Sequence, residues 1–581
     1  MANDKTDFTF RIAGEAGQGI TSAGLIFSKT AARLGFFVFD AIDYPSLIRG
    51  GHNVFSTRVS REKIYSLGQG VDFLVALNEN AVKVHLKELS QGAVVVFNSD
   101  RISSKIVSKK AAFFGVPLIS LAKAAGGQEV MMNNVALGIT AFLLKADFAV
   151  LSSVIKDVFS GAKPEIIDLN IKAAKAGFDY AKNNFKEAKL LFNLSKIAPK
   201  KAGLKGAKLL LSGNDAICLG AVAAGCKFFS AYPMTPINSL ISYFAVKAKD
   251  LNMVYYQPED EIAGINSAIG ASATGLRSMV ATSGGGFSLM VEAFGMAGMV
   301  EVPLVVVEGQ RPGPSSGMPT LSGQGDLGFI LSASQDDFPR IVLAPGDPEE
   351  CFWQTIEAFN LADKYQCPVV ILVDKNLCEN RESVPAFNEA SVKIDHLTMS
   401  LADQKKDYKR YLLTKTGISP RPIVGRKGNT FLANSYEHDE KGFFSDDAKI
   451  RKDMMEKRMR KLKVLKKEMP KPLVFGSKET DIGLISWGSN KGAILQAQAI
   501  LQERGIKTKF MHLNFLFPFP AKAVGEFLNS AKNILLVEQN ISGQLVSLIR
   551  RETGFEIKNK LLKYDGRMIL PEEIVERVKI T

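Results

Sequence analysis

Short apolar runs alternate with glycine-containing turns and amphipathic stretches from about residue 7 to residue 189. Residues 8–12 alternate apolar and polar positions as a half-buried strand does, and they lead through a glycine-rich turn into the helical pattern of residues 21–34. Further strand-like runs lie at residues 37–39, 73–77 and 93–97, and a later helix opens at residues 136–144. Strands that alternate with helices in this order predict an open α/β sheet.

Two further stretches show the same alternation, one at about residues 209–377 and one from residue 481 to the end. The first contains four strand-like runs, at residues 228–231, 253–256, 278–282 and 304–307, each followed by a polar or glycine-rich loop. The second contains a strand, a helix and two more strands, at residues 483–487, 491–504, 507–513 and 533–538. The predicted fold class is therefore α/β, a multidomain chain with three open α/β sheets.

The boundaries between these patterns fall in polar, lysine-rich sequence. Residues 196–208 form a linker that contains lysine, glycine and proline, and residues 388–478 are polar, with a basic helix around residues 446–468. We expect this second stretch to be a long connection that packs across domains without a core of its own. The predicted domains are residues 1–195, 205–385 and 479–581, with residues 386–478 as a basic connecting segment.

The composition is that of an ordinary globular protein, with 46% hydrophobic and 23% charged residues over 581 positions. The formal net charge of +14 raises nucleic-acid binding as an alternative. Much of the positive charge lies in residues 182–208 and 441–467, where aromatic residues are not interleaved with the charges as in a platform for stacked bases. We therefore expect solvated helix faces and linkers, and no nucleic-acid partner. A basic surface also suits an acidic protein partner or anionic substrates.

Cysteine usage and the apolar runs bear on metal sites and location. The five cysteines are scattered, at positions 218, 226, 351, 367 and 378, and none forms a Cys-x-x-Cys pair. Because iron–sulfur and zinc sites need grouped thiolates, we expect no metal site on this chain. Residues 1–8 are polar, and no apolar run reaches the ~20 residues that a membrane span needs. We therefore expect a cytoplasmic protein with no membrane partner.

The four strand-like runs of the second stretch end in loops that carry chemical groups. In order, the loops are Tyr232-Pro233-Met234-Thr235-Pro236, Gln257-Pro258-Glu259-Asp260-Glu261, Ser283-Gly284-Gly285-Gly286 and Glu308-Gly309-Gln310-Arg311-Pro312-Gly313. In an open parallel sheet, ligands bind beyond the carboxyl ends of the strands. A hydroxyl, a carboxylate, a bare backbone and a guanidinium would then meet in one crevice.

Each of these loops also has an ordinary structural interpretation. The acids at 259–261 could complement the dipole of the following helix, and the serine–glycine run could be a tight turn. Arg311 could be a surface charge and Thr235 a simple turn residue between two prolines. In a functional interpretation, the glycines allow close backbone approach to a flat ligand, and Arg311 captures a carboxylate through two parallel hydrogen bonds. Taken one at a time, the loops leave this choice open.

Taken together, the motifs resemble those of 2-oxoacid:ferredoxin oxidoreductases, and in particular their alpha subunits. Residues 232–236 resemble the Tyr-Pro-Ile-Thr-Pro signature of the family's pyrimidine-binding domain, with Met234 in place of isoleucine. Residues 310–320 are similar to the family's substrate loop, and residues 323–327 continue the match. The resemblance implies an enzyme that uses thiamine diphosphate to convert a 2-oxoacid and coenzyme A into acyl-CoA, CO2 and reduced ferredoxin, or the reverse.

The resemblance also implies roles for individual residues. Glu261 would be the catalytic glutamate, which activates the cofactor through a hydrogen bond to its aminopyrimidine ring, with Glu259 as the alternative. Arg311 would hold the carboxylate of the 2-oxoacid, and Thr235 and Tyr232 would contact the same substrate. The other cofactor contacts would come from Ser283, Gly284 and Gly285.

The remaining segments fit the same resemblance. Residues 14–19, 44–53 and 133–138 resemble the family's gamma domain, placed here ahead of the alpha part, which makes residues 1–195 gamma-type and residues 205–385 the pyrimidine-binding domain. The candidate contacts for a nucleotide or coenzyme A in the first domain are Gly14, Gly17 and Gly19, although no ribose-binding acid follows at the expected place. His52 is expected to be a packed or loop-capping residue. Residues 479–581 resemble the transketolase C-terminal domain.

Two absences predict a partner. The sequence contains no Gly-Asp-Gly, the motif with which thiamine diphosphate enzymes bind the metal that anchors the diphosphate, and its cysteines are not clustered. The resemblance therefore implies a beta subunit that carries the diphosphate site with Mg²⁺ and a 4Fe–4S cluster. The active site would be completed between the two subunits, as a heterodimer or a dimer of heterodimers, and this chain alone would be inactive. Ferredoxin and a small 2-oxoacid would be the other partners.

Other functions stay open at this stage. The Gly317-Met318-Pro319-Thr320 loop and the gamma–alpha fusion look most like 2-oxoglutarate enzymes, but pyruvate and branched-chain 2-oxoacids are alternatives. A transketolase-like enzyme without electron transfer would leave the gamma-like domain unexplained. A nucleotide-binding redox adaptor would leave the loops of the second stretch unexplained.

Overall fold

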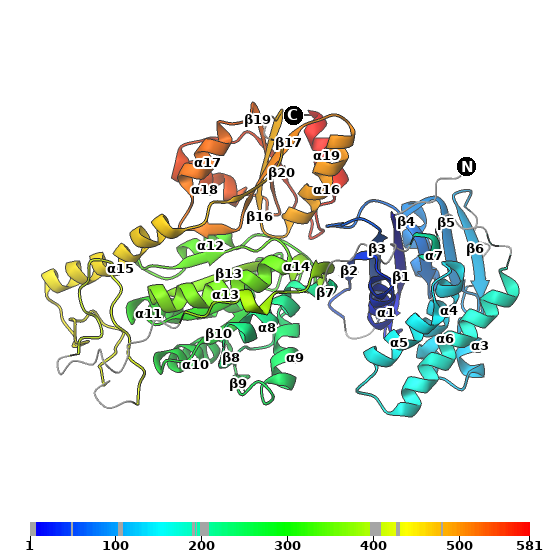
Figure 1. Cartoon of the computed structure of the whole chain (residues 1–581), viewed down its shortest axis with the longest axis horizontal. Helices are drawn as coiled ribbons and strands as arrows, with labels where there is room; N and C mark the ends of the chain where they lie inside the picture. Colours follow the sequence, from blue (N-terminus) through cyan, green and yellow to red (C-terminus); the bar gives the residue numbers. More distant parts are fainter. Residues whose placement is uncertain are drawn as a thin grey trace. The chain divides into compact units, whose positions relative to one another are not determined.

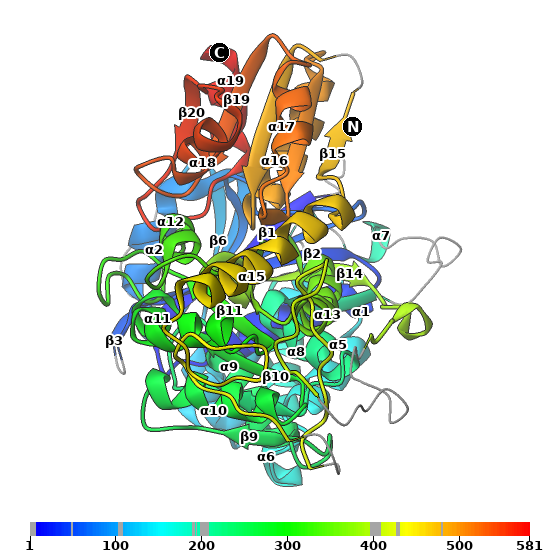
Figure 2. The same cartoon turned by 90° about the vertical axis from the view of Figure 1, so that its left-hand side faces the viewer.

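The computed structural model describes residues 7–47, 50–102, 108–186, 188, 192, 194–197, 208–395, 408–425, 430–477 and 480–580. These residues form three sheets, of eight, seven and five strands, which are packed with helices (Figure 1, Figure 2). The prediction of a multidomain α/β fold with three sheets is therefore confirmed. Most of the predicted linker at residues 196–208 lies outside the described residues, as do residues 48 and 49 of the gamma-like motif.

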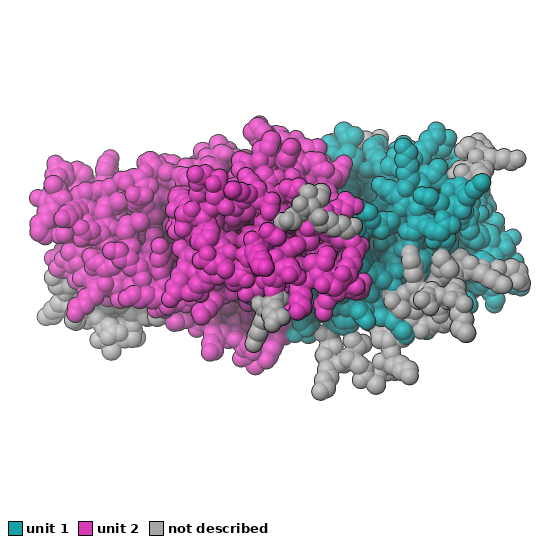
Figure 3. All heavy atoms as spheres, turned by 90° about the horizontal axis from the view of Figure 1, so that it is seen from above, with its two compact units in different colours: residues 1–211, 380–386, 570–572 teal, residues 212–379, 387–569, 573–581 magenta. Residues whose placement is uncertain are grey.

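The chain divides into two compact units. Residues 1–211, 380–386 and 570–572 form the first, and residues 212–379, 387–569 and 573–581 form the second (Figure 3). The first unit contains the eight-stranded sheet, and the second contains the other two sheets.

The eight-stranded sheet has the order β6-β5-β4-β1-β3-β2-β14-β7. Its strands are β1 (Asp7–Ala16), β2 (Phe37–Asp43), β3 (Gly50–Ser60), β4 (Val71–Ala76), β5 (Leu89–Asn98), β6 (Ala111–Val116), β7 (Lys208–Ser212) and β14 (Arg381–Pro385). The helices of the unit are α1 (Ile20–Arg33), α2 (Glu79–His85), α3 (Leu118–Ala124), α4 (Met132–Leu143), α5 (Phe148–Val158), α6 (Pro164–Asn184) and α7 (Leu194–Ile197). The sheet is mixed, because β1 runs parallel to β4 and antiparallel to β3.

The seven-stranded sheet has the order β18-β12-β13-β11-β10-β8-β9. Its strands are β8 (Phe228–Ser230), β9 (Val254–Tyr256), β10 (Ser278–Thr282), β11 (Leu304–Gln310), β12 (Ile341–Leu343), β13 (Pro368–Asp374) and β18 (Phe515–Phe517). Its helices are α8 (Gly213–Ala223), α9 (Asn238–Lys247), α10 (Glu261–Ala273), α11 (Gly284–Met299), α12 (Leu327–Ser332), α13 (Pro348–Tyr365) and α14 (Lys375–Glu379). All of its pairs are parallel except that between β12 and β18.

The five-stranded sheet has the order β15-β17-β16-β19-β20. Its strands are β15 (Leu473–Gly476), β16 (Ile482–Trp487), β17 (Thr508–Leu513), β19 (Asn533–Glu538) and β20 (Asn559–Leu562), and its helices are α16 (Asn490–Glu503), α17 (Ala521–Leu528), α18 (Gln544–Thr553) and α19 (Pro571–Ile580). β18 follows β17 along the chain but pairs with β12, so this part of the sequence adds an edge strand to the seven-stranded sheet.

Continuous apolar sequence explains the central strands. β10 and β19 have the predicted bounds, and the residues in the middle of each are apolar, as in a parallel strand covered by helices on both faces. β11 instead continues from Val307 to Gln310 through the charged residue Glu308, and every residue of the strand is buried. The predicted end at residue 307 assigned Glu308 to a loop, whereas the structure places it inside the sheet.

The basic segment at residues 441–467 is a solvated helix face only in part, because one side of the helix is buried. It forms most of α15 (Ala448–Glu468), which buries Lys457, Arg458 and Lys461 at 0%, 1% and 0% exposure. Figure 2 shows α15 crossing beside α11 and α13, and Lys461 Nζ lies 3.1 Å from the carbonyl oxygen of Gln366 at the end of α13. The buried charged residues of α15 therefore contribute to packing within the second unit.

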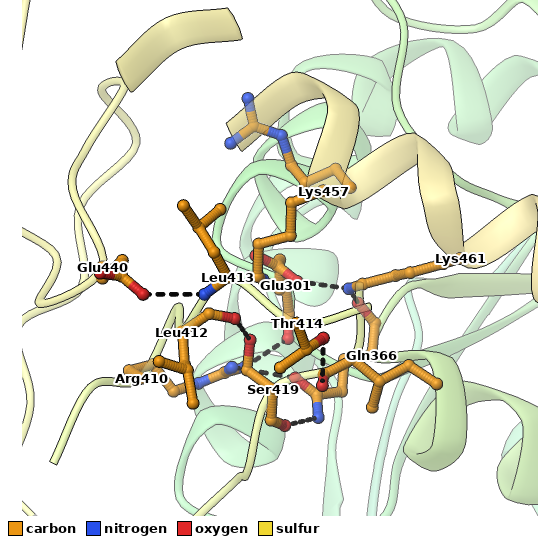
Figure 4. A network of polar contacts seen from close by, with 12 residues as sticks. Glu301, Gln366, Arg410, Leu412, Leu413, Thr414, Ser419, Glu440, Lys457 and Lys461 are labelled. Atoms are coloured by element: carbon orange, nitrogen blue, oxygen red, sulfur yellow. Dashed lines mark hydrogen bonds and ion pairs between the residues drawn. The ribbon is translucent and has the colours of Figure 1, made fainter. Parts of the chain in front are cut away.

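A buried acid explains why these lysines are tolerated. The Nζ atoms of Lys457 and Lys461 each lie 2.5 Å from a carboxylate oxygen of Glu301, and Arg410 donates to the carbonyl oxygen of the same residue at 2.6 Å (Figure 4). Burial would raise the pKa of Glu301, but the two ammonium groups outweigh burial and hold that pKa below its usual range. The helix sequence alone does not show this acid, which lies 156 residues before Lys457.

Among the described residues, no helix has both the length and the apolar character that crossing a membrane requires.

Candidate active site

The polar loops of the seven-stranded sheet meet at one edge, as predicted from their positions after parallel strands. β9, β8, β10 and β11 are adjacent and parallel, so the loops that follow them lie at the same end of the sheet. A pocket of about 450 Å³ opens there. Of the predicted residues, Ser283, Gly284, Gly285 and Arg311 line it. Tyr232, Thr235 and Glu261 lie in the loops and helix around it.

Glu261 is the first residue of α10, and its neighbours explain its position. Asp260 caps the helix, because its side chain accepts a hydrogen bond from the backbone N–H of Ala263 at 2.8 Å. The Glu261 side chain turns inward and is 4% exposed, whereas Glu259 is exposed. Of these two glutamates, Glu261 is therefore the buried one and Glu259 the exposed one.

The glycine run makes room for carboxylates. A Cβ added at Gly286 would lie 2.7 Å from Glu261 Oε1, and one added at Gly284 would lie 2.5 Å from Asp326 Oδ2. At Gly285 the nearest atom would be 3.9 Å away, so this residue alone of the three faces open space. The predicted close approach of backbone to a flat ligand can thus occur at Gly285, while the other two glycines accommodate acidic side chains.

Ser283 adds a polar atom without a partner. It precedes α11 as the N-cap residue, but its side chain makes no capping hydrogen bond, and its buried Oγ has no hydrogen-bond partner among the described residues. Buried hydroxyl groups are normally paired. This hydroxyl is therefore available to a ligand in the pocket.

Arg311 and Thr235 are brought together as predicted. Arg311 follows β11 directly, is half-buried, and donates from Nη1 to the carbonyl oxygen of Thr235 at 2.9 Å. The hydroxyl of Thr235 accepts a hydrogen bond from Asn238 Nδ2 at 3.3 Å. Burial lowers the pKa of Arg311, although the carboxylates of Asp326 and Glu308 oppose this shift. Tyr232, at 38% exposure, lies three residues before Thr235 at the surface.

The loop after Arg311 is held by its own backbone and by the five-stranded sheet. Gly317 has a φ of +50°, and a Cβ there would lie 1.8 Å from the carbonyl oxygen of Pro312. The N–H of Met318 donates to that same oxygen at 2.9 Å. Further along, Gln324 donates from its backbone N–H to the carbonyl oxygen of Gln539 at 2.8 Å. The third sheet therefore positions one wall of the pocket.

Sequence reasoning assigned no role to two acids at this site, Glu308 and Asp326. Glu308 is fully buried in β11, and neither of its carboxyl oxygens has a hydrogen-bond donor among the described residues. Asp326 lines the pocket beside Arg311. The available signal was a single glutamate after four apolar residues of a strand. A charged residue in such a position is costly unless it is neutral or paired.

The cysteines have the environment expected of core residues. All five are buried, and burial raises the pKa of the Cys226 and Cys367 thiols to about 12. In the described part of the chain, no group of three or more His, Cys, Asp or Glu side chains is arranged to hold a metal ion.

In the first unit, the glycine turn between β1 and α1 is mostly filled by a side chain of its own and by one from α4. A Cβ at Gly14 would lie 2.3 Å from Gln18 Oε1, and one at Gly19 would lie 2.1 Å from Asn133 Nδ2. Gly17 has a φ of +91° and no atom within 4 Å of such a Cβ. Of the three candidate nucleotide or coenzyme A contacts, Gly17 is thus the one with free space beside it.

His52 belongs to a charged cluster on the first sheet. Its Nε2 lies 2.8 Å from Nε2 of His85, whose Nδ1 is 3.0 Å from Arg11 Nη1 and 2.8 Å from Glu88 Oε2. Burial lowers the pKa of His52, and the neighbouring His85 and Arg11 lower it further. His52 is half-buried among these groups, and the structural role expected for it stays a prediction.

Comparison with known proteins gives three consecutive family matches. Residues 9–180 match the family described as pyruvate ferredoxin/flavodoxin oxidoreductase. Residues 219–457 match the family described as the thiamine-diphosphate-binding part of pyruvate flavodoxin/ferredoxin oxidoreductase. Residues 480–574 match the family described as pyruvate:ferredoxin oxidoreductase core domain II.

Similar proteins cover nearly the whole chain. The alpha subunit of 2-oxoacid:ferredoxin oxidoreductase 2 from Aeropyrum pernix is 32% identical, over 99% of this chain and 97% of its own length. The 2-oxoglutarate oxidoreductase subunit KorA from Mycobacterium tuberculosis is 30% identical, over 97% of this chain and 90% of its own length. The structure of 2-oxoglutarate:ferredoxin oxidoreductase from Magnetococcus marinus, with 2-oxoglutarate, coenzyme A and succinyl-CoA bound, aligns with a TM-score of 0.90 at 32% identity over 99% of both chains.

Proposed function

The chain belongs to the 2-oxoacid:ferredoxin oxidoreductase family, as an alpha subunit with a gamma-type domain ahead of it, and we propose that its substrate is 2-oxoglutarate. The proposed reaction converts 2-oxoglutarate and coenzyme A into succinyl-CoA and CO2 and passes two electrons to ferredoxin, or runs in reverse. The observation that carries the proposal is the buried carboxyl of Glu261, which lies against the glycine run at the edge of a pocket that also holds Arg311.

The residues around Glu261 fit an aminopyrimidine ring. A buried carboxyl can hold or accept a proton at a ring nitrogen. Beside it, the open backbone at Gly285 and the Ser283 hydroxyl, which has no partner among the described residues, offer a flat polar surface. When bound, thiamine diphosphate supplies the nucleophilic carbon and absorbs the charge that decarboxylation leaves on the substrate. Glu261 acts as the proton-holding group, and Ser283, Gly284 and Gly285 act as its cofactor-binding neighbours.

Arg311, Thr235 and Tyr232 form the substrate-binding side of the site. The guanidinium of Arg311 is fixed by its hydrogen bond to the backbone of Thr235, which leaves its other N–H groups for a carboxylate. An anionic 2-oxoacid therefore binds with its carboxylate at Arg311. The choice of 2-oxoglutarate is supported by the Magnetococcus marinus structure, which holds this compound and matches along the whole chain.

The chain supplies one side of the active site in this proposal. The sequence has no Gly-Asp-Gly, and the described residues offer no cluster of metal ligands and no exposed cysteines. A beta subunit would provide the diphosphate site with Mg²⁺ and the 4Fe–4S cluster, and ferredoxin would accept the electrons. Exposed apolar side chains around the site, including Tyr256, Ile262 and Leu289, suit a surface that such a subunit covers.

Coenzyme A is assigned to the glycine turn of the gamma-type domain. Gly17 has a left-handed backbone and free space, and it precedes the N-terminus of α1 by three residues. A helix N-terminus favours negatively charged phosphate groups. Gly14 and Gly19 shape this turn through their close contacts with Gln18 and Asn133.

The test is a viologen-reduction assay of the chain co-expressed with its candidate beta subunit. Reduction that requires both 2-oxoglutarate and coenzyme A is expected. Preferential reduction with pyruvate or 2-oxoisovalerate would keep the family chemistry but overturn the substrate assignment. An intact, cofactor-loaded complex that reduces viologen with none of these 2-oxoacids would overturn the proposed function.

A further inference from the structure

Glu308 is a buried acid whose carboxyl group has no hydrogen-bond partner in the described part of the chain. It lies in the centre of the seven-stranded sheet, on β11, and is 0% exposed. No donor among the described residues reaches either of its carboxyl oxygens. The ionisable groups that face it are Asp326 and Arg311 at the pocket, Asp374 at the end of β13 and Cys378 on α14. A lone ionised carboxylate in such a position would be very costly.

Asp326 connects this buried acid to the pocket. Its backbone N–H donates to Gln310 Oε1 at 3.1 Å, and its carboxyl packs against the backbone of Gly284. The carboxyl groups of Glu308 and Asp326 lie within hydrogen-bonding reach of each other. Asp374 is different, because it accepts hydrogen bonds from Ser489 Oγ at 2.7 Å and from the N–H of Leu377 at 3.1 Å. Since no donor among the described residues reaches Glu308, Asp326 is the group with which it can share a proton.

Two adjacent buried carboxyls share protons rather than ionise together. Burial raises the pKa of Glu308 well above its usual range, and the neighbouring Asp326 raises it further. Burial also raises the pKa of Asp326, although the hydrogen bond from Glu308 and the charge of Arg311 oppose this. These opposite effects of the shared hydrogen bond favour the proton on Glu308 and the negative charge on Asp326, beside Arg311.

We propose that the Glu308–Asp326 pair takes up a second proton when an anionic 2-oxoacid binds at Arg311, so that Asp326 becomes a neutral hydrogen-bond donor to the substrate. This inference rests on the proposed function, since it names how that pocket accepts its substrate. The proton comes from solvent and no bond of the substrate is made or broken. Asp326 thereby becomes a substrate-binding residue and Glu308 its positioning residue.

The physical reason is competition for one cation. An ionised Asp326 neutralises Arg311 and repels a second carboxylate in the same pocket, whereas a protonated Asp326 releases Arg311 and adds an O–H donor. Substrate affinity then falls as pH rises, because the free site must gain a proton to bind. Linkage sets the slope at about tenfold in KM per pH unit once the free pair has lost that proton.

The direct test is calorimetry on the cofactor-loaded complex with 2-hydroxyglutarate, which keeps both carboxylates but has no keto carbon to react. Titrations in two buffers of different ionisation enthalpy give the number of protons taken up on binding. We expect an uptake of up to one proton in the wild type, and almost none in Asp326→Asn, whose amide is a permanent donor. Glu308→Gln should keep the uptake, since its amide donates to Asp326 as the protonated acid does.

The pH profile of KM for 2-oxoglutarate is the second readout. It should rise about tenfold per pH unit in the alkaline limb of the wild type and be flat in Asp326→Asn. Binding without proton uptake in the wild type, or equal uptake in Asp326→Asn, would overturn the proposal that the Glu308–Asp326 pair takes up the proton. If Asp326→Asn does not fold, the proton uptake and the KM profile of the wild type still test whether binding is coupled to protonation. A complex that turns over no 2-oxoacid, yet takes up a proton when 2-hydroxyglutarate binds, would contradict the proposed function but support the role of the Glu308–Asp326 pair.

Discussion

Two glutamates separated by a single residue have opposite environments. Glu259 is exposed in the loop after β9, whereas Glu261 is the first residue of α10 and its carboxyl is packed against Gly286. Asp260, between them, caps the helix and so fixes which of its neighbours faces inward. At the residue scale, the two glutamates thus differ in burial although a single capping residue separates them.

Glu261→Gln should nearly abolish viologen reduction in the assembled complex, because an amide cannot hold or release the proton at the ring. A loss of about 10²- to 10⁴-fold in kcat is expected for removal of such a group. Glu259→Gln is the matched control and should retain most of the activity. The reverse order would move the catalytic assignment two residues upstream.

Arg311→Ala should act chiefly on substrate binding. Charge-assisted hydrogen bonds to a carboxylate contribute about 1.5–3 kcal/mol, so KM for 2-oxoglutarate should rise about tenfold to a hundredfold. Arg311→Lys keeps the charge but not the two parallel donors, and an intermediate KM is expected. Steady-state kinetics check both variants, with the exposed Arg550→Ala as a control. An unchanged KM in Arg311→Ala would contradict the assigned role.

At the scale of elements, α15 departs most from its sequence. The lysine and arginine residues of this helix predict an exposed helix, but three of them are buried. They are paired with Glu301 and Glu437, which lie outside the helix in the sequence. Periodicity predicts that the helix exists and roughly where it ends, but it contains no information about a partner that far away. The same limit applies to Glu308, which reads as the start of a loop and lies in a strand.

Glu301→Gln should destabilise the second unit strongly, since it leaves Lys457 and Lys461 buried without an anion. Removing one partner of a buried ion pair typically costs about 3–5 kcal/mol. The matched control is Glu456→Gln on the exposed face of α15, where the loss of an exposed pair should cost no more than about 1 kcal/mol. Urea unfolding of the full chain, followed by circular dichroism, compares the two. Equal effects would show that the buried cluster does not stabilise the unit.

At the scale of the whole molecule, the sheets and the pocket loops could be predicted from the sequence. Apolar runs such as residues 278–282 give strand bounds directly, and loops after parallel strands must meet at one edge. The sequence did not predict which strands pair with distant parts of the chain. β18 follows a strand of the five-stranded sheet but pairs with β12, and β14 pairs with β2 of the first sheet. The contact between Glu308 and Asp326 was not predicted either, because Glu308 was expected in a loop and lies inside β11.

The central claim is that this chain supplies part of an active site which a second subunit completes. The measurement that tests it most directly is viologen reduction with 2-oxoglutarate, coenzyme A, Mg²⁺ and thiamine diphosphate by the purified chain, by the beta subunit, and by the two combined. We predict activity in the combination and none with either subunit alone. Turnover by this chain alone, at a rate comparable to that of the combination, would contradict the account.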